Sequence, residues 1–325
     1  MRQEHALVTP LTVTAVREEI KGFKVFSFKE RLPYKAGQYL TFALQRTGGE
    51  IRRSYSITSS PVLQEPLSIG VKRIENGIFS RMLIDTVEPG DQLSSIGTGG
   101  FFTLPDSILL YQQIFFFAAG SGITPIYSLI KESLYRHPHL QIVLIYSNAS
   151  VDKTVFYHEL NVLQHRFEKR FRIRYLFSNN PVLYEARLHK QLLEELVSSL
   201  AVATSGERLY YVCGPEAYIR MCTYTLIENH VPQENIRREN FAVVPVRISK
   251  EAIPDRTTRR VTLFSPDGEI FFDVVYPDTI LQAAKKQGIA LPYSCETGRC
   301  GSCGATCISG AGRHSLNEVL TRKRL

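Results

Sequence analysis

The chain of 325 residues has no tryptophan, three methionines and six cysteines. It also lacks the run of about 18 apolar residues that a membrane-spanning helix needs, because the longest such stretch, SILLYQQIFFFAAG, is interrupted by two glutamines. The first ten residues, MRQEHALVTP, lack the apolar core of a secretory signal. These absences argue against a membrane span and against secretion, and we expect a cytoplasmic protein.

Concentrated charge is absent as well. The net charge is +8, but the basic residues are spread along the chain and the longest block is RKR near the end. Nucleic-acid-binding surfaces usually gather Lys and Arg on one face or in one segment. We therefore expect no nucleic-acid partner, and we interpret the positive excess as a bias toward acidic partners or anionic cofactors.

Three regions differ in hydrophobic pattern, so a multidomain chain is predicted. Residues 1–106 contain short alternating runs such as GFKVFSFK, typical of an antiparallel β-barrel. Residues 107–241 alternate apolar runs such as QIFFFAAG with helical segments, which predicts an α/β domain with a parallel sheet. Residues 242–256 are interpreted as a linker. Residues 257–325 are expected to form an α+β domain of two strands, a helix and a cysteine-rich loop.

Four of the six cysteines lie in one stretch, PYSCETGRCGSCGATC, and three of them have the spacing C-x4-C-x2-C. These three, Cys295, Cys300 and Cys303, have the plant-type [2Fe–2S] spacing. The surrounding glycines allow the tight backbone curl that brings N–H donors to the cluster sulfides. A structural zinc loop is the alternative, but zinc sites usually pair two C-x2-C knuckles and only one is present.

The fourth cysteine of the stretch, Cys307, follows Cys303 by only three residues, which leaves its role open. It is either a further ligand or an ordinary apolar position on a strand formed by GATCISG, and we favour the strand.

Two motifs in the first region suit a flavin. RRSYSITSSP contains Arg53, Tyr55 and Ser56 as R-x-Y-S: a guanidinium can hold a diphosphate, a tyrosine ring can stack on an isoalloxazine, and a small hydroxyl can approach flavin N5. NGIFSRML places Gly77 and Ser80 at a predicted helix N-terminus, where free N–H groups favour phosphate.

Two strand-to-helix turns in the second region suit a nicotinamide nucleotide. AAGSGITP places Gly120, Gly122 and Thr124 after an apolar strand, where glycines let the backbone approach a diphosphate, although the full dinucleotide fingerprint is not matched. A second strand end, followed by a helix, carries Cys213, Gly214 and Pro215. The last strand of the region ends at RRENF, which supplies Glu239 and Phe241.

The order R-x-Y-S, G-x-x-S, G-x-G-x-T-P, C-G-P resembles that of the ferredoxin–NADP reductase superfamily. With a C-terminal plant-type ferredoxin domain of β-grasp fold, the whole chain resembles the reductase components of multicomponent oxygenases. Its resemblance is strongest to the reductase subunit of phenylacetyl-CoA epoxidase systems. The implied activity is electron transfer from NAD(P)H through FAD and a [2Fe–2S] cluster to a terminal oxygenase or another protein acceptor.

The resemblance also implies roles for individual residues. The flavin would be held by Arg53, Tyr55, Ser56, Gly77 and Ser80. NAD(P)H would meet Gly120, Gly122, Thr124, Cys213, Gly214 and Pro215, with Glu239 and Phe241 close to the flavin. The residues implied in catalysis are Tyr55, Ser56, Cys213 and Glu239. FAD is favoured over FMN because the NGIFS loop lacks the arginine of the FMN type, and NADPH over NADH, with Ser147 and Lys153 as candidate 2′-phosphate contacts.

In plant-type ferredoxins the last cysteine follows a leucine-rich turn ending in LTC. The sequence here has the lead-in HSLNEVLTRKRL and then ends, so we expect it to stop before the fourth ligand. Two alternatives therefore stay open: a stand-alone flavin or quinone reductase with a degenerate ferredoxin tail, and a non-enzymatic metal-binding carrier or regulator.

Overall fold

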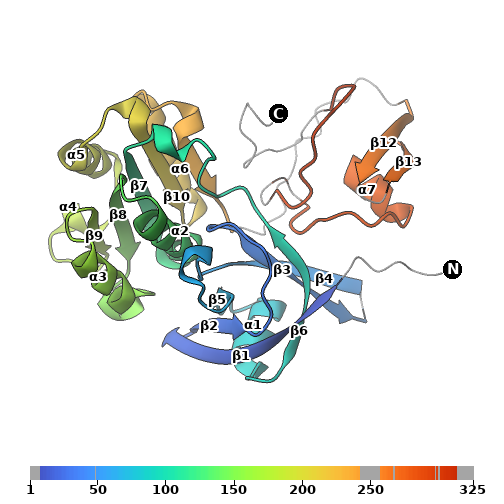
Figure 1. Ribbon diagram of the computed structural model, residues 1–325, viewed down its shortest axis with the longest axis horizontal. Coiled ribbons are helices and arrows are strands. Elements are labelled where there is room, and N and C mark those ends of the chain that lie inside the picture. Colours follow the sequence, from blue (N-terminus) through green and yellow to red (C-terminus); the bar gives the residue numbers. More distant parts are fainter. Residues whose placement is uncertain are drawn as a thin grey trace.

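The computed structural model describes residues 8–47, 49–241, 257–265, 268–296, 298 and 301–312. Within these residues the strands form three sheets, and Figure 1 shows them as three bodies, in blue to cyan, green to yellow, and orange to red along the chain. The predicted linker, residues 242–256, and the predicted ligand Cys300 lie outside the described residues.

The first sheet has six antiparallel strands in the order β4-β3-β6-β1-β2-β5. Its strands are β1 (Thr9–Ile20), β2 (Phe23–Phe28), β3 (Tyr39–Arg46), β4 (Gly49–Ser56), β5 (Ser68–Lys72) and β6 (Gln92–Gly99). An antiparallel bridge between Ile57, just after β4, and Ile69 of β5 joins the two edge strands. The sheet is therefore closed into the predicted barrel.

Alternation along the barrel strands sends one side of each strand inward. Leu11 and Val13 of β1 are buried, as are Leu40 and Phe42 of β3, in a single apolar cluster. Helix α1 (Ile78–Thr86) contributes Phe79, Leu83 and Ile84 to the same cluster. The barrel core thus fixes the N-terminus of α1, where G-x-x-S lies, close to β4.

The second sheet has five parallel strands in the order β11-β10-β7-β8-β9. Its strands are β7 (Gln113–Ala119), β8 (Gln141–Asn148), β9 (Phe171–Phe177), β10 (Arg208–Cys213) and β11 (Ile236–Glu239). The helices between them are α2 (Ile123–Arg136), α3 (Tyr157–Arg166), α4 (Leu183–Ala186), α5 (Lys190–Leu200) and α6 (Glu216–Glu228).

Short 3-10 turns connect elements in both of these domains. They are η1 (Pro61–Leu63), η2 (Ile108–Leu110), η3 (Gly120–Gly122), η4 (Val151–Lys153), η5 (Ser205–Glu207) and η6 (Gln233–Asn235).

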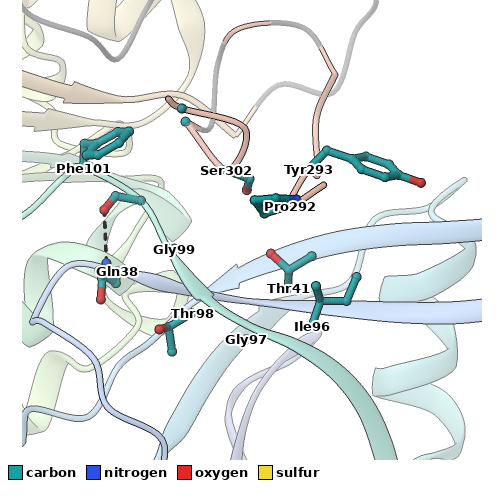
Figure 2. Close-up of a pocket in the computed structure, with 13 residues that line it drawn as sticks. Gln38, Thr41, Ile96, Gly97, Thr98, Gly99, Phe101, Pro292, Tyr293 and Ser302 are labelled. Atoms are coloured by element: carbon teal, nitrogen blue, oxygen red, sulfur yellow. Dashed lines mark hydrogen bonds between the residues drawn. The ribbon is translucent and has the colours of Figure 1, made fainter. Parts of the chain in front are cut away.

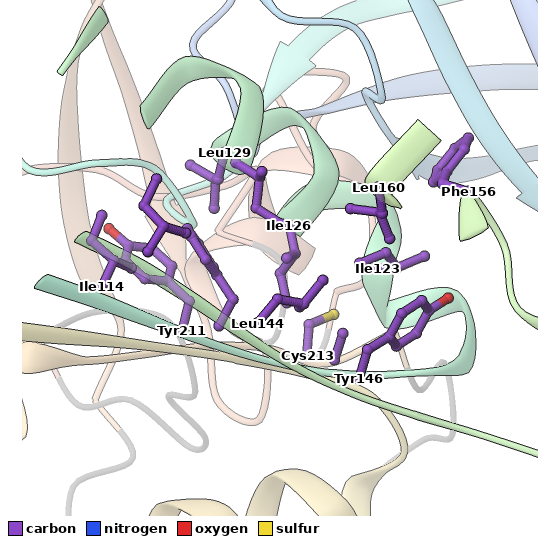
Figure 3. Packing of buried hydrophobic residues seen from close by; sticks show 14 of the residues in the cluster. Ile114, Ile123, Ile126, Leu129, Leu144, Tyr146, Phe156, Leu160, Tyr211 and Cys213 are labelled. Atoms are coloured by element: carbon purple, nitrogen blue, oxygen red, sulfur yellow. The ribbon is translucent and has the colours of Figure 1, made fainter. Parts of the chain in front are cut away.

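Helices cover both faces of this sheet, as its buried central strands β7, β8 and β10 require. Phe116 of β7 faces the cluster that includes α2 and α3, shown in Figure 3, whereas Phe115 and Phe117 face the cluster that includes α5 and α6. The strand order reverses direction between β7 and β10. In open parallel sheets the ligand crevice lies at such a switch point, at the carboxyl ends of the strands.

The third unit is smaller. Strands β12 (Arg259–Ser265) and β13 (Gly268–Val274) form an antiparallel hairpin. Helix α7 (Ile280–Lys286) packs on this hairpin, with Ala283 and Ala284 of the helix in one apolar cluster with Phe272 of β13. Thr279 begins α7 with a capping box to Gln282, so the predicted helix is confirmed. The prediction of a strand over GATCISG, residues 304–310, is wrong, because residues 304–308 have no strand structure.

Cys307 is exposed, and its thiol lies 3.4 Å from the Ser309 carbonyl oxygen as a donor. It is therefore not the apolar strand position that we expected. Glycines and small residues on both sides give the segment too little apolar surface to pack. Among the described helices none has the length and apolar character to cross a bilayer.

Candidate functional site

The two predicted flavin motifs come together on the barrel. The ring of Tyr55, at the end of β4, lies 6.0 Å from that of Phe79, which stands between Gly77 and Ser80 at the start of α1. A further ring, Phe42 of β3, lies 6.4 Å from Tyr55. This packing leaves Tyr55 half-buried, and burial raises the pKa of its phenol. An aromatic surface is thereby placed beside a helix N-terminus.

Arg53 and Ser56 differ in their access to solvent. Arg53 is exposed, and its guanidinium donates to the Arg52 carbonyl at 2.7 Å. An exposed guanidinium of this kind can bind a diphosphate through two parallel hydrogen bonds. Ser56 is only 4% exposed, so its hydroxyl is covered by neighbouring residues.

Gly77 and Ser80 shape the turn that begins α1. The Ser80 hydroxyl accepts from the Ile74 N–H at 3.2 Å and lies 3.3 Å from the Gly77 carbonyl oxygen. A Cβ added at Gly77 would lie 2.5 Å from the Ser80 hydroxyl oxygen. Gly77 is therefore needed for the close turn, and the N–H groups of the first α1 turn remain available for an anion.

The nucleotide turns of β7 and β10 lie against one another at the switch point of the parallel sheet. A Cβ at Gly122 would lie 2.1 Å from the Cys213 carbonyl oxygen and 2.8 Å from the Gly214 nitrogen. Gly120 has φ +54°, which favours glycine. The two turns therefore pack backbone against backbone, and only glycine at position 122 allows this close approach.

Thr124 connects this crevice to the barrel. A Cβ at Gly70 of β5 would lie 2.7 Å from the Thr124 methyl group and 3.1 Å from that of Thr58. Thr58 lies two residues after Ser56. The contact places the nucleotide turn directly beside the end of the R-x-Y-S segment, so the predicted flavin and nicotinamide motifs meet at one junction between the two sheets.

Sequence reasoning missed Gly70, although a glycine inside a strand pattern is a signal of close backbone approach. It also missed a buried polar contact at the same junction. Lys131 of α2 is 4% exposed and pairs with Glu65, and the Ser60 hydroxyl donates to Glu132 at 3.0 Å. Burial lowers the pKa of Lys131. No local pattern identifies these residues, because their partners lie far away in the sequence, in the connection between β4 and β5.

Glu239 and Cys213 form a buried pair at the carboxyl ends of β11 and β10, where they are register neighbours. Burial raises the pKa of the Glu239 carboxyl to about 8, and burial and then the nearby Glu239 raise the pKa of the Cys213 thiol. One carboxyl oxygen of Glu239 is buried without a hydrogen-bond partner among the described residues. An unpaired buried oxygen is costly, and a ligand N–H donor would satisfy it. Phe241, 40% exposed, follows at the edge of the described region.

The candidate 2′-phosphate contacts have different surroundings. Lys153 is exposed on η4, whereas the Ser147 hydroxyl oxygen is buried at the end of β8. Of the two, only Lys153 presents its polar group to solvent.

The described residues around the cysteines include left-handed backbone. Glu296, Gly298 and Gly301 have positive φ angles, a conformation that favours glycine. Desolvation, and then the nearby Cys295, raise the pKa of the Cys303 thiol. Two thiols on one tight loop are the donor type that iron or zinc binds, and the third predicted ligand, Cys300, lies outside the described residues.

A flavin-type barrel, a nicotinamide-type crevice beside it and a thiol-bearing loop define a three-part redox protein. Three family models match the chain in the same order: an oxidoreductase FAD-binding domain over residues 12–103, an oxidoreductase NAD-binding domain over 116–223 and a 2Fe-2S iron-sulfur cluster binding domain over 264–325. The chain is thus an oxidoreductase with FAD-, NAD- and [2Fe–2S]-binding domains.

Relatives of this kind cover nearly the whole chain. It is 30% identical to one subunit of the 1,2-phenylacetyl-CoA epoxidase of Escherichia coli (92% of this chain, 86% of the relative). It is also 30% identical to the 3-ketosteroid-9-alpha-monooxygenase ferredoxin reductase component of Rhodococcus rhodochrous (92% and 86%). The chain belongs to this family of oxygenase reductase components. The solved structure of phthalate dioxygenase reductase has the same fold, with a TM-score of 0.64, 22% identity and coverage of 99% and 93%.

Proposed function

We propose that this protein takes electron pairs from NADPH or NADH and delivers single electrons to an oxygenase of the phenylacetyl-CoA epoxidase type. The proposal rests above all on the junction where Thr124 meets Gly70 and Thr58, because it brings the nicotinamide and flavin motifs together. FAD, when bound, accepts a hydride and can release its electrons one at a time. The relatives named above support an oxygenase as the acceptor.

The residues of the barrel would hold the flavin in two ways. Tyr55 would offer its ring face to the isoalloxazine, supported from behind by Phe42 and Phe79. The diphosphate would bind to the exposed guanidinium of Arg53. It would also bind to the N–H groups that follow Gly77, where the dipole of α1 favours an anion. Ser56 would act close to the ring system, on the covered side of β4.

The crevice residues would orient the nicotinamide. Gly120 and Gly122 would cradle the diphosphate, while Thr124 would fix the turn through its hydrogen bond to the Ser121 carbonyl at 2.9 Å. Glu239, protonated at neutral pH because its pKa is about 8, would exchange a hydrogen bond with the carboxamide beside Cys213. Holding two rings in contact and excluding water supplies most of the rate advantage in such a transfer. Lys153 supports NADPH as the donor.

The remaining assignments follow from the same scheme. Gly214 and Pro215 would line the crevice at the start of α6, and Phe241 would cover the flavin. Cys295, Cys300 and Cys303 would ligate the cluster. Domain boundaries at 1–106, 107–241 and 257–325 are supported by the family-model ranges. A nicotinamide donor and cluster thiolates suit the reducing cytoplasm.

Two acceptors test the order of transfer. Purified protein should reduce ferricyanide, which can take electrons at the flavin, and cytochrome c, which depends on the cluster. Cys300→Ser should leave the first activity largely intact and abolish the second. Equal loss of both activities, with flavin content unchanged, would contradict the proposed order.

A further inference from the structure

The cysteine loop lies directly against the flavin barrel (Figure 2). Two hydroxyl–hydroxyl hydrogen bonds join them: Ser54 of β4 to Ser294 at 2.7 Å, and Tyr39 of β3 to Ser302 at 2.6 Å. Ser294 and Ser302 directly precede Cys295 and Cys303 in the sequence. The barrel is therefore bonded to the residue next to each of the two described cysteines of the motif.

An aromatic ring between two cations reinforces this contact. The Arg52 guanidinium lies 3.8 Å from the centroid of the Tyr293 ring, and the Lys285 ammonium lies 4.2 Å from the same centroid. Arg52 and Lys285 come from β4 and α7, so the ring of Tyr293 has one cation from each domain. The side chain of Arg52 is only 10% exposed, which strengthens a cation–π contact by excluding water.

Both cations are held in place by carboxylates. Glu50, two residues before Arg52 on β4, accepts from the Arg52 Nε at 2.5 Å. Glu296, next to Cys295, accepts from the Lys285 ammonium at 2.7 Å. Each domain thus neutralises and orients its own cation before the two meet at Tyr293.

A few contacts hold this interface together rather than continuous packing. A cleft of about 240 Å³ remains between the loop and the glycine-rich end of β6. It is lined on one side by residues 96–101 and on the other by Pro292, Ser302 and Gly304. Because the contact area is interrupted, loss of one contact should shift the balance between docked and undocked domains.

β4 is the shared wall of the two redox sites. Ser54 faces the cysteine loop, whereas its neighbour Tyr55 packs on the barrel side with Phe42 and Phe79. We propose that Arg52, Tyr293 and Lys285, with Ser54 and Ser294, form a docking clamp that holds the cysteine loop at a fixed distance from the flavin. These are positioning residues, and their role in electron transfer rests on the function proposed above.

The absence of tryptophan makes the clamp directly measurable. Tyr293→Trp keeps an aromatic face for both cations and introduces the only tryptophan of the chain. The reference variant is Phe271→Trp, because position 271 lies on β13 of the same domain and is 60% exposed. In the flavin-loaded protein, acrylamide should quench the tryptophan at position 293 less than the tryptophan at position 271. Adding Arg52→Ala should raise quenching of the first variant and leave the second unchanged.

The expected size follows from a desolvated cation–π contact, whose loss should lower the docked-to-undocked ratio about 30-fold. Arg46→Ala, on the exposed end of β3, is the matched control and should not change quenching. Equal quenching at positions 293 and 271, or no effect of Arg52→Ala, would refute the clamp. The cofactor absorption spectrum is unaffected by either result and tests the proposed function separately.

A second measurement avoids the tryptophan. In the otherwise unchanged protein, Arg52→Ala should increase hydrogen exchange of peptides covering residues 292–296. It should also slow cytochrome c reduction, because the docked fraction falls, while ferricyanide reduction and cluster absorbance stay constant. Unchanged exchange in these peptides would overturn the proposal even if the tryptophan variants did not fold.

Discussion

Gly122→Ala is the perturbation with the clearest geometric consequence. The added Cβ would lie 2.1 Å from the Cys213 carbonyl oxygen and 2.5 Å from the Cys213 carbonyl carbon. Both are backbone atoms at the end of β10, and ordinary contact would require the turns to separate by roughly 1 Å. Overpacking of this kind costs about 1–3 kcal/mol, and we expect the upper part of that range because no flexible side chain can yield.

The same displacement should impair the reaction more than it impairs folding. A shift of about 1 Å in a positioning element can cost about 100-fold in rate, so kcat/KM for NAD(P)H should fall by about two orders of magnitude. The atoms nearest to the added Cβ belong to Cys213 and Gly214 and not to the flavin motifs, so flavin content should stay near that of the unmodified protein. Urea unfolding measures the free energy of unfolding, flavin absorbance measures the flavin content, and ferricyanide reduction measures kcat/KM.

Gly206→Ala is the matched control, because a Cβ there would have no atom within 4 Å. This change should leave the activity intact and alter the free energy of unfolding by less than about 1 kcal/mol. If Gly122→Ala behaved like Gly206→Ala in both stability and kcat/KM, the conclusion that the turns after β7 and β10 are in close backbone contact would be refuted.

Three further predictions concern the other parts of the scheme. Tyr55→Ala should lower the flavin content of purified protein, whereas Tyr55→Phe should retain it because the ring face is preserved; equal flavin occupancy in both would contradict a stacking role. Burial raises the pKa of Glu239 from an ordinary 4.5 to about 8, so the folded state binds this proton more tightly than the unfolded chain and stability falls as pH rises from 4.5 through 8. The stability of Glu239→Gln relative to the unmodified protein should therefore increase between pH 5 and pH 8, as measured by urea midpoints. A stability difference that does not change with pH would refute the raised pKa of a buried carboxyl. Lys131→Met should leave flavin binding intact but lower the free energy of unfolding, measured in urea, by about 1–3 kcal/mol, because Glu65 loses its cation and keeps the Ser60 N–H as a donor. Lys131→Arg should recover part of this loss.

The sequence predicted the elements well where local patterns decide them. Fully apolar runs became the central parallel strands, and the turns after β7 and β10 met because parallel strands end at one edge. The pairing of Cys213 with Glu239 also follows from neighbouring strand ends. Cys307 was misplaced because GATCISG reads as a strand only if something packs against it, and its surroundings are too small and polar for that.

Contacts between domains could not be predicted from local patterns. Gly70 meets Thr124, Lys131 meets Glu65 and Ser54 meets Ser294 only because three separately folded units lie in one arrangement. Each partner is ordinary in its own segment: a strand glycine, a helix lysine, a strand serine. The R-x-Y-S motif indicated a role for Arg53 and Tyr55, but its intervening serine and the preceding Arg52 gained meaning only from the cysteine loop beside them.

An anaerobic reductive titration tests the central claim most directly. A flavin that takes two electrons and a cluster that takes one should together consume about 1.5 equivalents of NADPH or NADH per chain. The flavin and cluster bands should both bleach in the course of the titration. An end-point at about one equivalent with flavin bleaching alone, or no bleaching at all, would contradict the account.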